Sequence, residues 1–526
     1  MLIFKNNGSV CQSRHRITAV YGFVVKRLAA VVIVALVTLL LTVPAAWSQC
    51  SWELLWTFTG AAAGDYFGYS VSGAGDVNND GYDDLIVGAD WNDAGGSNAG
   101  RAYVYSGQTG ALLWTFTGAA AGDYFGHSVS GAGDVNNDGY DDLIVGAHWN
   151  DAGGTDAGRA YVYSGQTGAL LWTFTGEAAG DRFGVSVSGA GDVNNDGYED
   201  LMVGAYTNDA GGIWAGRAYV YSGQTGALLW TFTGEAAADN FGNSVSGAGD
   251  VNSDGYDDLI VGAWLNDAGG ASAGRAYVYS GQTGVLLWTF TSEAAGDSFG
   301  VSVSGAGDVN NDGYDDLIVG AYGNDAGGDD AGRAYVYSGQ NGALLRTFTG
   351  AAAGDHFGVS VSGAGDVNND GYADLIVGAQ YNSAGGTNAG RAYVYSGRSG
   401  TLLCTFTGEA AYDCFGLSVS GAGDVNNDGY DDLIVGAYLN DAGGADAGRA
   451  YVYSCQVEEP YILGDANGDG LIDVGDVVYL INYLFKSGPT PNPIQAADAT
   501  CDGNVDVADV VYLINYLFKS GPSPSC

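Results

Sequence analysis

Basic residues are scarce in this sequence. Lys and Arg number 17 of 526 residues against 60 Asp and Glu, which gives a formal net charge of −43. Five of the 17 fall in residues 1–49, which contain no acid, so the rest of the chain carries 12 basic residues against 60 acidic ones, a balance of −48. A surface of this charge repels nucleic acid and anionic lipid, and both are excluded as partners.

Proline (7 residues) and histidine (4) are also scarce, whereas glycine (89) and tyrosine (35) are abundant. Few prolines among many Gly, Tyr, Val, Trp and Phe are typical of a turn-rich β protein and not of a disordered chain. Beyond residue 49 the histidines are His127, His148 and His356, which stand at three different positions of the repeat described below. No His-based catalytic arrangement is indicated.

The N-terminal apolar run is short for a membrane span. Leu28–Val43 follows basic residues and precedes small residues at Ala46 and Ser48. Since a spanning helix needs about 20 apolar residues, the pattern predicts a secretory signal over residues 1–48, cleaved near Ser48. A retained membrane anchor is the alternative. After cleavage we expect a secreted, extracellular monomer with no membrane insertion.

The chain is organised around one nine-residue stretch, Asp76–Asp84, which occurs seven times at an unbroken spacing of 58 residues. Side-chain oxygens at positions 1, 3, 5 and 9, a backbone carbonyl at position 7 and a glycine at position 6 suit calcium, a hard cation held by oxygen ligands in a sharply turned loop. A single copy could be a solvated Asn/Asp-Gly turn. Seven copies with an acid or Asn at every side-chain ligand position favour calcium.

The predicted propeller ligands, with the position-7 residue contributing its carbonyl, are Asp76, Asn78, Asp80, Tyr82, Asp84, Asp134, Asn136, Asp138, Tyr140, Asp142, Asp192, Asn194, Asp196, Tyr198, Asp200, Asp250, Asn252, Asp254, Tyr256, Asp258, Asp308, Asn310, Asp312, Tyr314, Asp316, Asp366, Asn368, Asp370, Tyr372, Asp374, Asp424, Asn426, Asp428, Tyr430 and Asp432.

Each repeat contains four strand-like runs separated by Gly-rich turns. In the first copy they are Phe67–Ala74, Asp84–Ala89, Arg101–Ser106 and Leu112–Gly118, called A, B, C and D. Four short strands repeated seven times predict a mainly β fold, a seven-bladed β-propeller with four-stranded blades. The repeats show no 3.6-residue periodicity, which excludes a helical solenoid.

The ends of the repeat region predict a closed ring. A D run appears first, at Leu54–Gly60, and the last repeat stops after its C run at Ser454, so the N-terminal D strand can complete the seventh blade. Cys50 and Cys455 align with neighbouring positions of the C–D turn, which predicts a disulfide at the seam. Exported chains commonly form disulfides, and we also expect Cys404 to pair with Cys414 and Cys501 with Cys526.

The order of the strands assigns two faces. The A–B turns, with the calcium loops, and the C–D turns share one face, and the B–C and D–A turns share the other. Residues that differ between copies fall on this second face, where exposed aromatics could hold a sugar ring or a protein; neutral drift is the alternative. They include Asp90-Trp91, Ser97-Asn98, Tyr206, Ile213-Trp214, Trp264-Leu265 and the series Tyr66, Tyr124, Arg182, Asn240, Ser298, His356 and Cys414.

Seven arginines stand at one repeat position, which predicts a structural ion pair with a nearby Asp and not seven ligand sites. They are Arg101, Arg159, Arg217, Arg275, Arg333, Arg391 and Arg449.

The C-terminal segment changes from period-2 to helical patterning. Two EF-hand-like calcium loops, 33 residues apart, are each followed by an apolar run at helix spacing, Val477–Lys486 and Val510–Lys519. This predicts a small α-helical module. Its predicted ligands are Asp465, Asn467, Asp469, Leu471 (carbonyl), Asp473 and Asp476, then Asp498, Thr500, Asp502, Asn504 (carbonyl), Asp506 and Asp509.

Both regions resemble known families. Phe67-Gly68, the Asp76–Asp84 loop and Val87-Gly88-Ala89 resemble the FG-GAP repeat of the integrin alpha-subunit propeller, although Asp90 stands where that family has proline. Residues 463–526 resemble a type I dockerin, which implies binding to a cohesin domain. We therefore expect a signal at 1–48, a propeller at 50–455, a linker at 456–462 and a dockerin at 463–526.

The combined expectation is a secreted calcium-binding adhesion or recognition module, with about seven calcium ions in the propeller and two in the dockerin. Its propeller would bind an unknown glycan or protein, and its dockerin would tether it to a cohesin-bearing scaffold or cell surface. The alternative is a polysaccharide-degrading enzyme, a lyase or glycosidase, or an accessory module in polysaccharide catabolism. No catalytic constellation supports it, because the acids are repeated in every blade.

Overall fold

The computed structural model describes residues 51–456, 462–491, 494–519 and 521–524. One compact unit is Ser51–Gln456, and the described residues beyond Val457 belong to another. The predicted signal, Cys50, most of the predicted linker and Cys526 lie outside the described residues. Within the described part, no helix is both long enough and apolar enough to cross a membrane.

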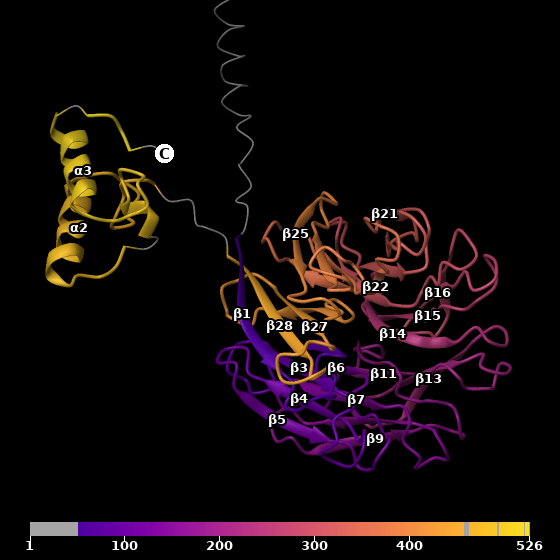
Figure 1. Ribbon diagram of the computed structural model, residues 1–526. Helices are drawn as coiled ribbons and strands as arrows, with labels where there is room; N and C mark the ends of the chain where they lie inside the picture. Colours follow the sequence, from indigo (N-terminus) through magenta and orange to yellow (C-terminus); the bar gives the residue numbers. More distant parts are fainter. Residues whose placement is uncertain (1–50, 457–461, 492–493, 520, 525–526) are drawn as a thin grey trace, which may run out of the picture. The chain divides into compact units, whose positions relative to one another are not determined.

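The first unit is a seven-bladed β-propeller of four-stranded antiparallel sheets, as predicted (Figure 1). In A to D order the strands of blades 1 to 4 are β2 (Val71–Gly75), β3 (Asp84–Ala89), β4 (Arg101–Tyr105) and β5 (Leu112–Thr117); β6 (Val129–Gly133), β7 (Asp142–Ala147), β8 (Arg159–Tyr163) and β9 (Leu170–Thr175); β10 (Val187–Gly191), β11 (Asp200–Ala205), β12 (Arg217–Tyr221) and β13 (Leu228–Thr233); β14 (Phe241–Gly249), β15 (Asp258–Ala263), β16 (Arg275–Tyr279) and β17 (Leu286–Thr291).

Blades 5 to 7 contain β18 (Val303–Gly307), β19 (Asp316–Ala321), β20 (Arg333–Tyr337) and β21 (Leu344–Thr349); β22 (Phe357–Gly365), β23 (Asp374–Ala379), β24 (Arg391–Tyr395) and β25 (Leu402–Thr407); β26 (Val419–Gly423), β27 (Asp432–Ala437), β28 (Arg449–Gln456) and β1 (Ser51–Thr59). The A strand is shorter than predicted in five blades. In blade 1, for example, Phe67 precedes the strand and bridges to Gly448 of blade 7.

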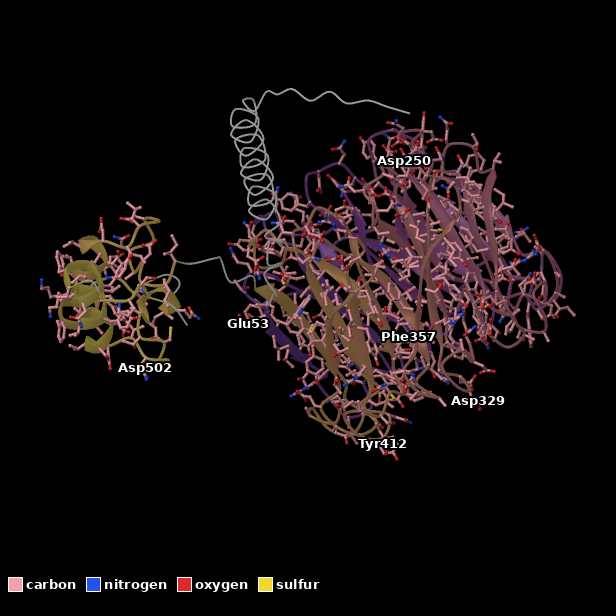
Figure 2. All side chains as sticks on the ribbon, turned by 90° about the horizontal axis from the view of Figure 1, so that it is seen from above. Glu53, Asp250, Asp329, Phe357, Tyr412 and Asp502 are labelled. Atoms are coloured by element: carbon pink, nitrogen blue, oxygen red, sulfur yellow. The ribbon has the colours of Figure 1, made fainter. Side chains whose placement is uncertain are left out.

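The turns divide between two faces of the propeller. The A–B loop at Asp250 lies at one end of the sheets, whereas the B–C turn at Asp329 and the D–A turn at Tyr412 lie at the other (Figure 2). All seven predicted calcium loops join an A strand to a B strand, so they share the first face. The face of the B–C and D–A turns is called the free face below.

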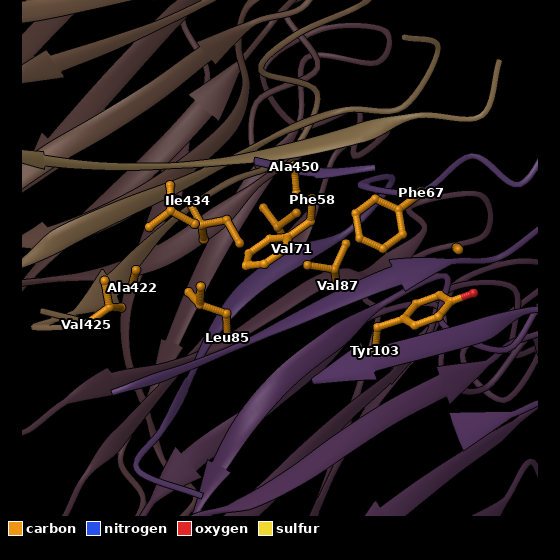
Figure 3. Close-up of a cluster of buried hydrophobic side chains, with 12 residues drawn as sticks. Phe58, Phe67, Val71, Leu85, Val87, Tyr103, Ala422, Val425, Ile434 and Ala450 are labelled. Carbon is orange, nitrogen blue, oxygen red and sulfur yellow. The ribbon is translucent and has the colours of Figure 1, made fainter. Parts of the chain in front are cut away.

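The hydrophobic core lies between the blades. The B strand Asp84–Ala89 is buried along its whole length because a neighbouring blade covers each face of its sheet. One cluster joins Phe67 and Val87 of blade 1 to Ile434 and Ala450 of blade 7 (Figure 3). An equivalent cluster occupies each of the other six blade boundaries. The apolar surface of one blade is therefore buried only when its neighbours are in place.

Hydrogen bonds also tie the blades together around the axis. At every boundary the Oγ of a serine directly before or within one A strand accepts a hydrogen bond from the backbone N–H of a valine in the next A strand, as between Ser70 and Val129 at 3.1 Å. The bond from Val71 to Ser418, at 3.0 Å, closes the series between the first and last blades. The other five bonds have the same partners one repeat further along.

The predicted closure by the N-terminal strand is confirmed. β1 pairs antiparallel with β28 and completes the sheet that contains β26 and β27. Phe58 of β1 is 8% exposed, close to the 7% of its counterpart Phe116 in blade 1. Cys455 is disulfide-bonded, as is Cys501. Their predicted partners lie outside the described residues, so both pairings stay predictions.

The predicted disulfide between Cys404 and Cys414 is wrong, since both thiols are free. Cys404 packs on β25 beside Trp52 and Tyr453 of blade 7. Cys414 lies past the end of that strand on the D–A connection, where its thiol is hydrogen-bonded to the Tyr438 side chain. The two side chains contact different neighbours, and burial raises the pKa of each thiol to about 11.

The predicted Arg–Asp pair is also wrong. The repeated arginine donates its Nε–H to a threonine of the adjacent D strand, as from Arg101 to Thr117 at 3.1 Å. Where the copy supplies a glutamate, the arginine pairs with it, as Arg217 does with Glu177 at 2.9 Å. Both partners are partly exposed, so such a pair contributes little to stability.

The C-terminal unit contains α2 (Val474–Lys486), a 3-10 turn η1 (Ile494–Ala497) and α3 (Val507–Lys519). Both helices begin three residues earlier than predicted. For α2 the reason is a capping box, in which Asp473 accepts the backbone N–H at the third helical position and Asp476 accepts that of Asp473. Leu480 and Leu513 are fully buried between the helices.

Because β1 has the same environment as an internal D strand, we predict that Phe58→Ala and Phe116→Ala destabilise the propeller equally, by about 3–5 kcal/mol each. Urea unfolding in calcium measures both. A Phe58→Ala effect below about 1 kcal/mol, beside a full effect at Phe116, would mean that β1 frays from its blade.

Candidate calcium loops and the free face

Each propeller loop is held in one conformation by its first carboxylate. Asp76 accepts hydrogen bonds from the backbone N–H groups of Asp80 (3.0 Å) and Gly81 (2.8 Å), and Asp80 accepts one from Tyr82 (3.1 Å). Gly81 has a φ of +87°, a conformation that glycine adopts without steric cost. The same bonds recur in every blade, with equal or nearly equal lengths.

The position-9 aspartate is fully buried at the base of each loop. Asp84 accepts hydrogen bonds from the backbone of Gly107 (2.9 Å) and from Asn78 Nδ2 (2.9 Å). Burial, with smaller contributions from the charges of Asp80 and Asp76, raises the pKa of Asp84 to about 7. A cation held in the loop would favour the ionised carboxylate, because an adjacent positive charge offsets its desolvation.

The donor set of each loop fits a hard cation, since it contains only oxygen ligands around a glycine turn. Within the residues that the structure describes, no three His, Cys, Asp or Glu side chains are arranged to hold a metal ion. The loop carboxylates are bonded instead to backbone N–H groups. The structure thus places every predicted propeller ligand in one A–B loop per blade, and the ligand sets themselves stay predictions.

The position-8 acid has a structural role that was not predicted from the sequence. Asp141 Oδ2 of blade 2 accepts a hydrogen bond from the backbone N–H of Asp76 in blade 1, at 2.8 Å. Four other boundaries have the same bond. A side chain at Gly75 would collide with Asp141, so the glycine is required there. An acid at position 8 in six of seven copies was the available signal, with Ala373 as the exception.

The two C-terminal loops repeat this pattern. Asp465 accepts hydrogen bonds from Asp469 (3.1 Å) and Gly470 (2.7 Å), and Asp498 accepts them from Asp502 (3.2 Å) and Gly503 (2.8 Å). In the second loop, Thr500 donates its hydroxyl to Asp509 at 2.9 Å. That proton would have to turn away for Thr500 to bind an ion through its oxygen.

On the free face the structure joins residues that are far apart in sequence. His127 Nδ1 lies 2.9 Å from Asp90 Oδ2, across the boundary of blades 1 and 2. The His127 and His148 rings lie with their centroids 4.0 Å apart and their planes tilted by 41°. This cluster was not predicted from the sequence, because it forms across a blade boundary: Asp90 and His148 occupy one repeat position and His127 another. The other predicted free-face residues include Trp91 (39% exposed) and Trp214 (55%).

Comparison with known proteins gives two family matches. The FG-GAP repeat matches residues 67–105, 125–163, 183–221, 241–279, 299–337, 357–395 and 415–453. The dockerin type I domain matches residues 463–518.

Curated relatives include integrin alpha-5 of Xenopus laevis, 34% identical over 220 residues, which cover 38% of this chain and 20% of that protein. Integrin alpha-8 of Gallus gallus is 32% identical over 232 residues, covering 41% of this chain and 21% of the relative. Integrin alpha-PS2 of Drosophila melanogaster is 33% identical over 223 residues, covering 38% and 15%. The matched region is thus about a fifth or less of the length of these relatives.

If the loops bind calcium, excess EGTA should lower Tm by at least about 10 °C, because each of the seven propeller sites, when filled at 100 times its Kd, adds about 2.7 kcal/mol to native stability. Scanning calorimetry in calcium and in EGTA measures the shift. Equal Tm values in the two solutions would contradict calcium binding by the folded state.

The hydrogen bond that the position-8 aspartate accepts from the neighbouring blade leads to a second prediction, about stability. Asp315→Ala should reduce the free energy of unfolding by about 1–3 kcal/mol, because it leaves the backbone N–H of Asp250 without its acceptor. Asp329→Ala is the matched control, since it removes the same charge from an exposed position on the free face. Equal effects of the two substitutions in urea titrations would show that charge, and not the bond, is responsible.

Proposed function

The chain belongs to the FG-GAP repeat family, and on this premise we propose that it is an exported recognition module. Its propeller binds a glycan or protein on the free face, its loops bind calcium, and its dockerin tethers it to a cohesin-bearing scaffold or cell surface. The observation that carries this proposal is the asymmetry of the faces. Seven near-identical loops occupy one face, whereas the differences between copies are concentrated on the other.

Calcium is proposed to stabilise the ring. Each loop brings at least three carboxylates onto one face, and like charges at short range destabilise the folded chain unless they are neutralised. Seven ions in the propeller and two in the dockerin would change the balance of −48 to −30. Millimolar extracellular calcium suits weak sites of this kind. Native mass spectrometry in calcium should therefore detect nine ions on the full chain.

The dockerin surface supports a tethering role. α2 exposes Val478 (51%) and Phe485 (64%), and α3 exposes their counterparts Val511 (49%) and Phe518 (65%). Exposed apolar side chains at matching places on paired helices are suited to a protein interface. This favours cohesin as the partner of the C-terminal unit.

One observation favours the enzymatic alternative. The pairing of His127 with buried Asp90 resembles the orientation of a general base by a carboxylate. It is confined to one blade boundary, as a catalytic group in a repeat protein would be. Parallel assays of binding and of product release separate a recognition module from a polysaccharide-degrading enzyme.

The test uses the full mature chain in calcium on an array of polysaccharides, extracellular proteins and cohesin domains. We expect capture by a cohesin and by at least one further ligand, without product release. Val478→Asp combined with Val511→Asp should abolish cohesin capture and leave the second ligand bound. Absence of any ligand besides cohesin would contradict the recognition role.

A further inference from the structure

Four aromatic side chains form a continuous row on the free face. Tyr66 contacts Trp91 with ring centroids 4.7 Å apart, Trp91 contacts Tyr124 at 5.9 Å, and Tyr124 contacts Trp149 at 5.7 Å. These four residues are called the aromatic row. The Arg182 guanidinium lies over the Trp149 ring at 4.8 Å and over the Tyr206 ring at 5.5 Å, so it connects the row to blade 3. The row therefore extends from the start of blade 1 to the start of blade 3.

The fold does not require this row. Its members occupy two repeat positions, one in the D–A turn and one in the B–C turn. In blades 4 and 5 the same positions hold Asn240, Leu265, Ser298 and Gly323. The backbone is unchanged, since φ is 55° at Tyr66, 54° at Asn240 and 55° at Ser298. Because a bulky residue is unfavourable at positive φ, tyrosine there adds strain without building the turn.

Buried polar side chains lie next to the aromatic row. Asp90 and His148 precede Trp91 and Trp149 in the chain and are 2% and 6% exposed. Asp90 Oδ2 pairs with His127, whereas Asp90 Oδ1 and His148 Nδ1 are buried without a hydrogen-bond partner among the described residues. A buried polar atom without a hydrogen-bond partner carries a free-energy cost, because it has lost its bonds to water. A ligand that brings hydroxyl groups to this place would remove that cost.

We propose that the aromatic row, with Asp90, His127 and His148, is a binding site for a neutral polysaccharide. A sugar ring has an apolar C–H face, which can stack on Tyr and Trp, and a rim of hydroxyls, which can bond to the carboxylate and imidazoles. Few polar groups among aromatic walls are typical of small-ligand sites. A polyanion is disfavoured by the balance of −48. A purely apolar partner would leave the buried polar atoms unpaired.

This inference rests on the proposed function and narrows its ligand. The test compares the full mature chain in calcium with the Trp91→Leu, Trp149→Leu double variant. Leucine occurs naturally at the same position in Leu265 and Leu439, so the variant preserves a turn that the fold already contains. Tyr412→Ala is the matched control, because Tyr412 is 60% exposed on the free face but lies outside the row, and alanine occurs at the same repeat position in Ala238.

Affinity electrophoresis with a soluble β-glucan, xylan and galactomannan, and with polygalacturonate as the anionic arm, gives the readout. We expect retardation by a neutral glycan. The affinity should be roughly fivefold or more weaker in the double variant, because two aromatic faces on which a sugar ring would stack are lost, and within about twofold of wild type in the control.

Three results would overturn the proposal. Retardation by polygalacturonate alone would exclude a neutral ligand. Equal affinity of the double variant and the wild type would exclude the aromatic row as the site. If the protein bound no neutral glycan but captured an extracellular protein on the array, a saccharide ligand would be excluded. The recognition role would then remain intact.

Discussion

A blade of this protein can bury its apolar surface only against another blade. The B strands are covered on both faces, and each of the seven core clusters is shared by two neighbouring sheets. An open array would expose two such surfaces at its ends. The ring must therefore close. It closes because β1, the N-terminal strand, joins the last sheet, so no long connection across the seam is needed. The gathering of the seven loops on one face, and of the aromatic row on the other, depends on this closure.

Closure also brings seven acidic loops together on one face. The backbone N–H of Asp76 bonds to Asp141 of the next blade, and similar bonds at four other boundaries connect the loops. The charges that accumulate there explain why a divalent cation would stabilise the ring. Because this face is occupied by one repeated structure, differences between copies are found on the opposite face, where the aromatic row lies.

The repeat itself allowed the blade architecture, the B strands and the permuted closure to be predicted, because seven copies show which positions are constant within the chain. Contacts between blades were harder to predict from the sequence. The bond from Asp76 to Asp141 and the pair of Asp90 with His127 depend on the angle between neighbouring sheets, which no local pattern contains. The pairing of Cys404 with Cys414 failed for the same reason, since closeness in sequence did not make their side chains neighbours.

Closure of the ring requires that β1 is held as firmly as the internal D strands. Hydrogen–deuterium exchange of the mature chain in calcium, followed by mass spectrometry, measures this directly. If the ring is closed, β1 and β28 amides exchange as slowly as those of β5 and β4. If β1 amides exchange at the rate of an unpaired segment while the internal D strands stay protected, the ring is open at the seam, which would contradict closure by β1.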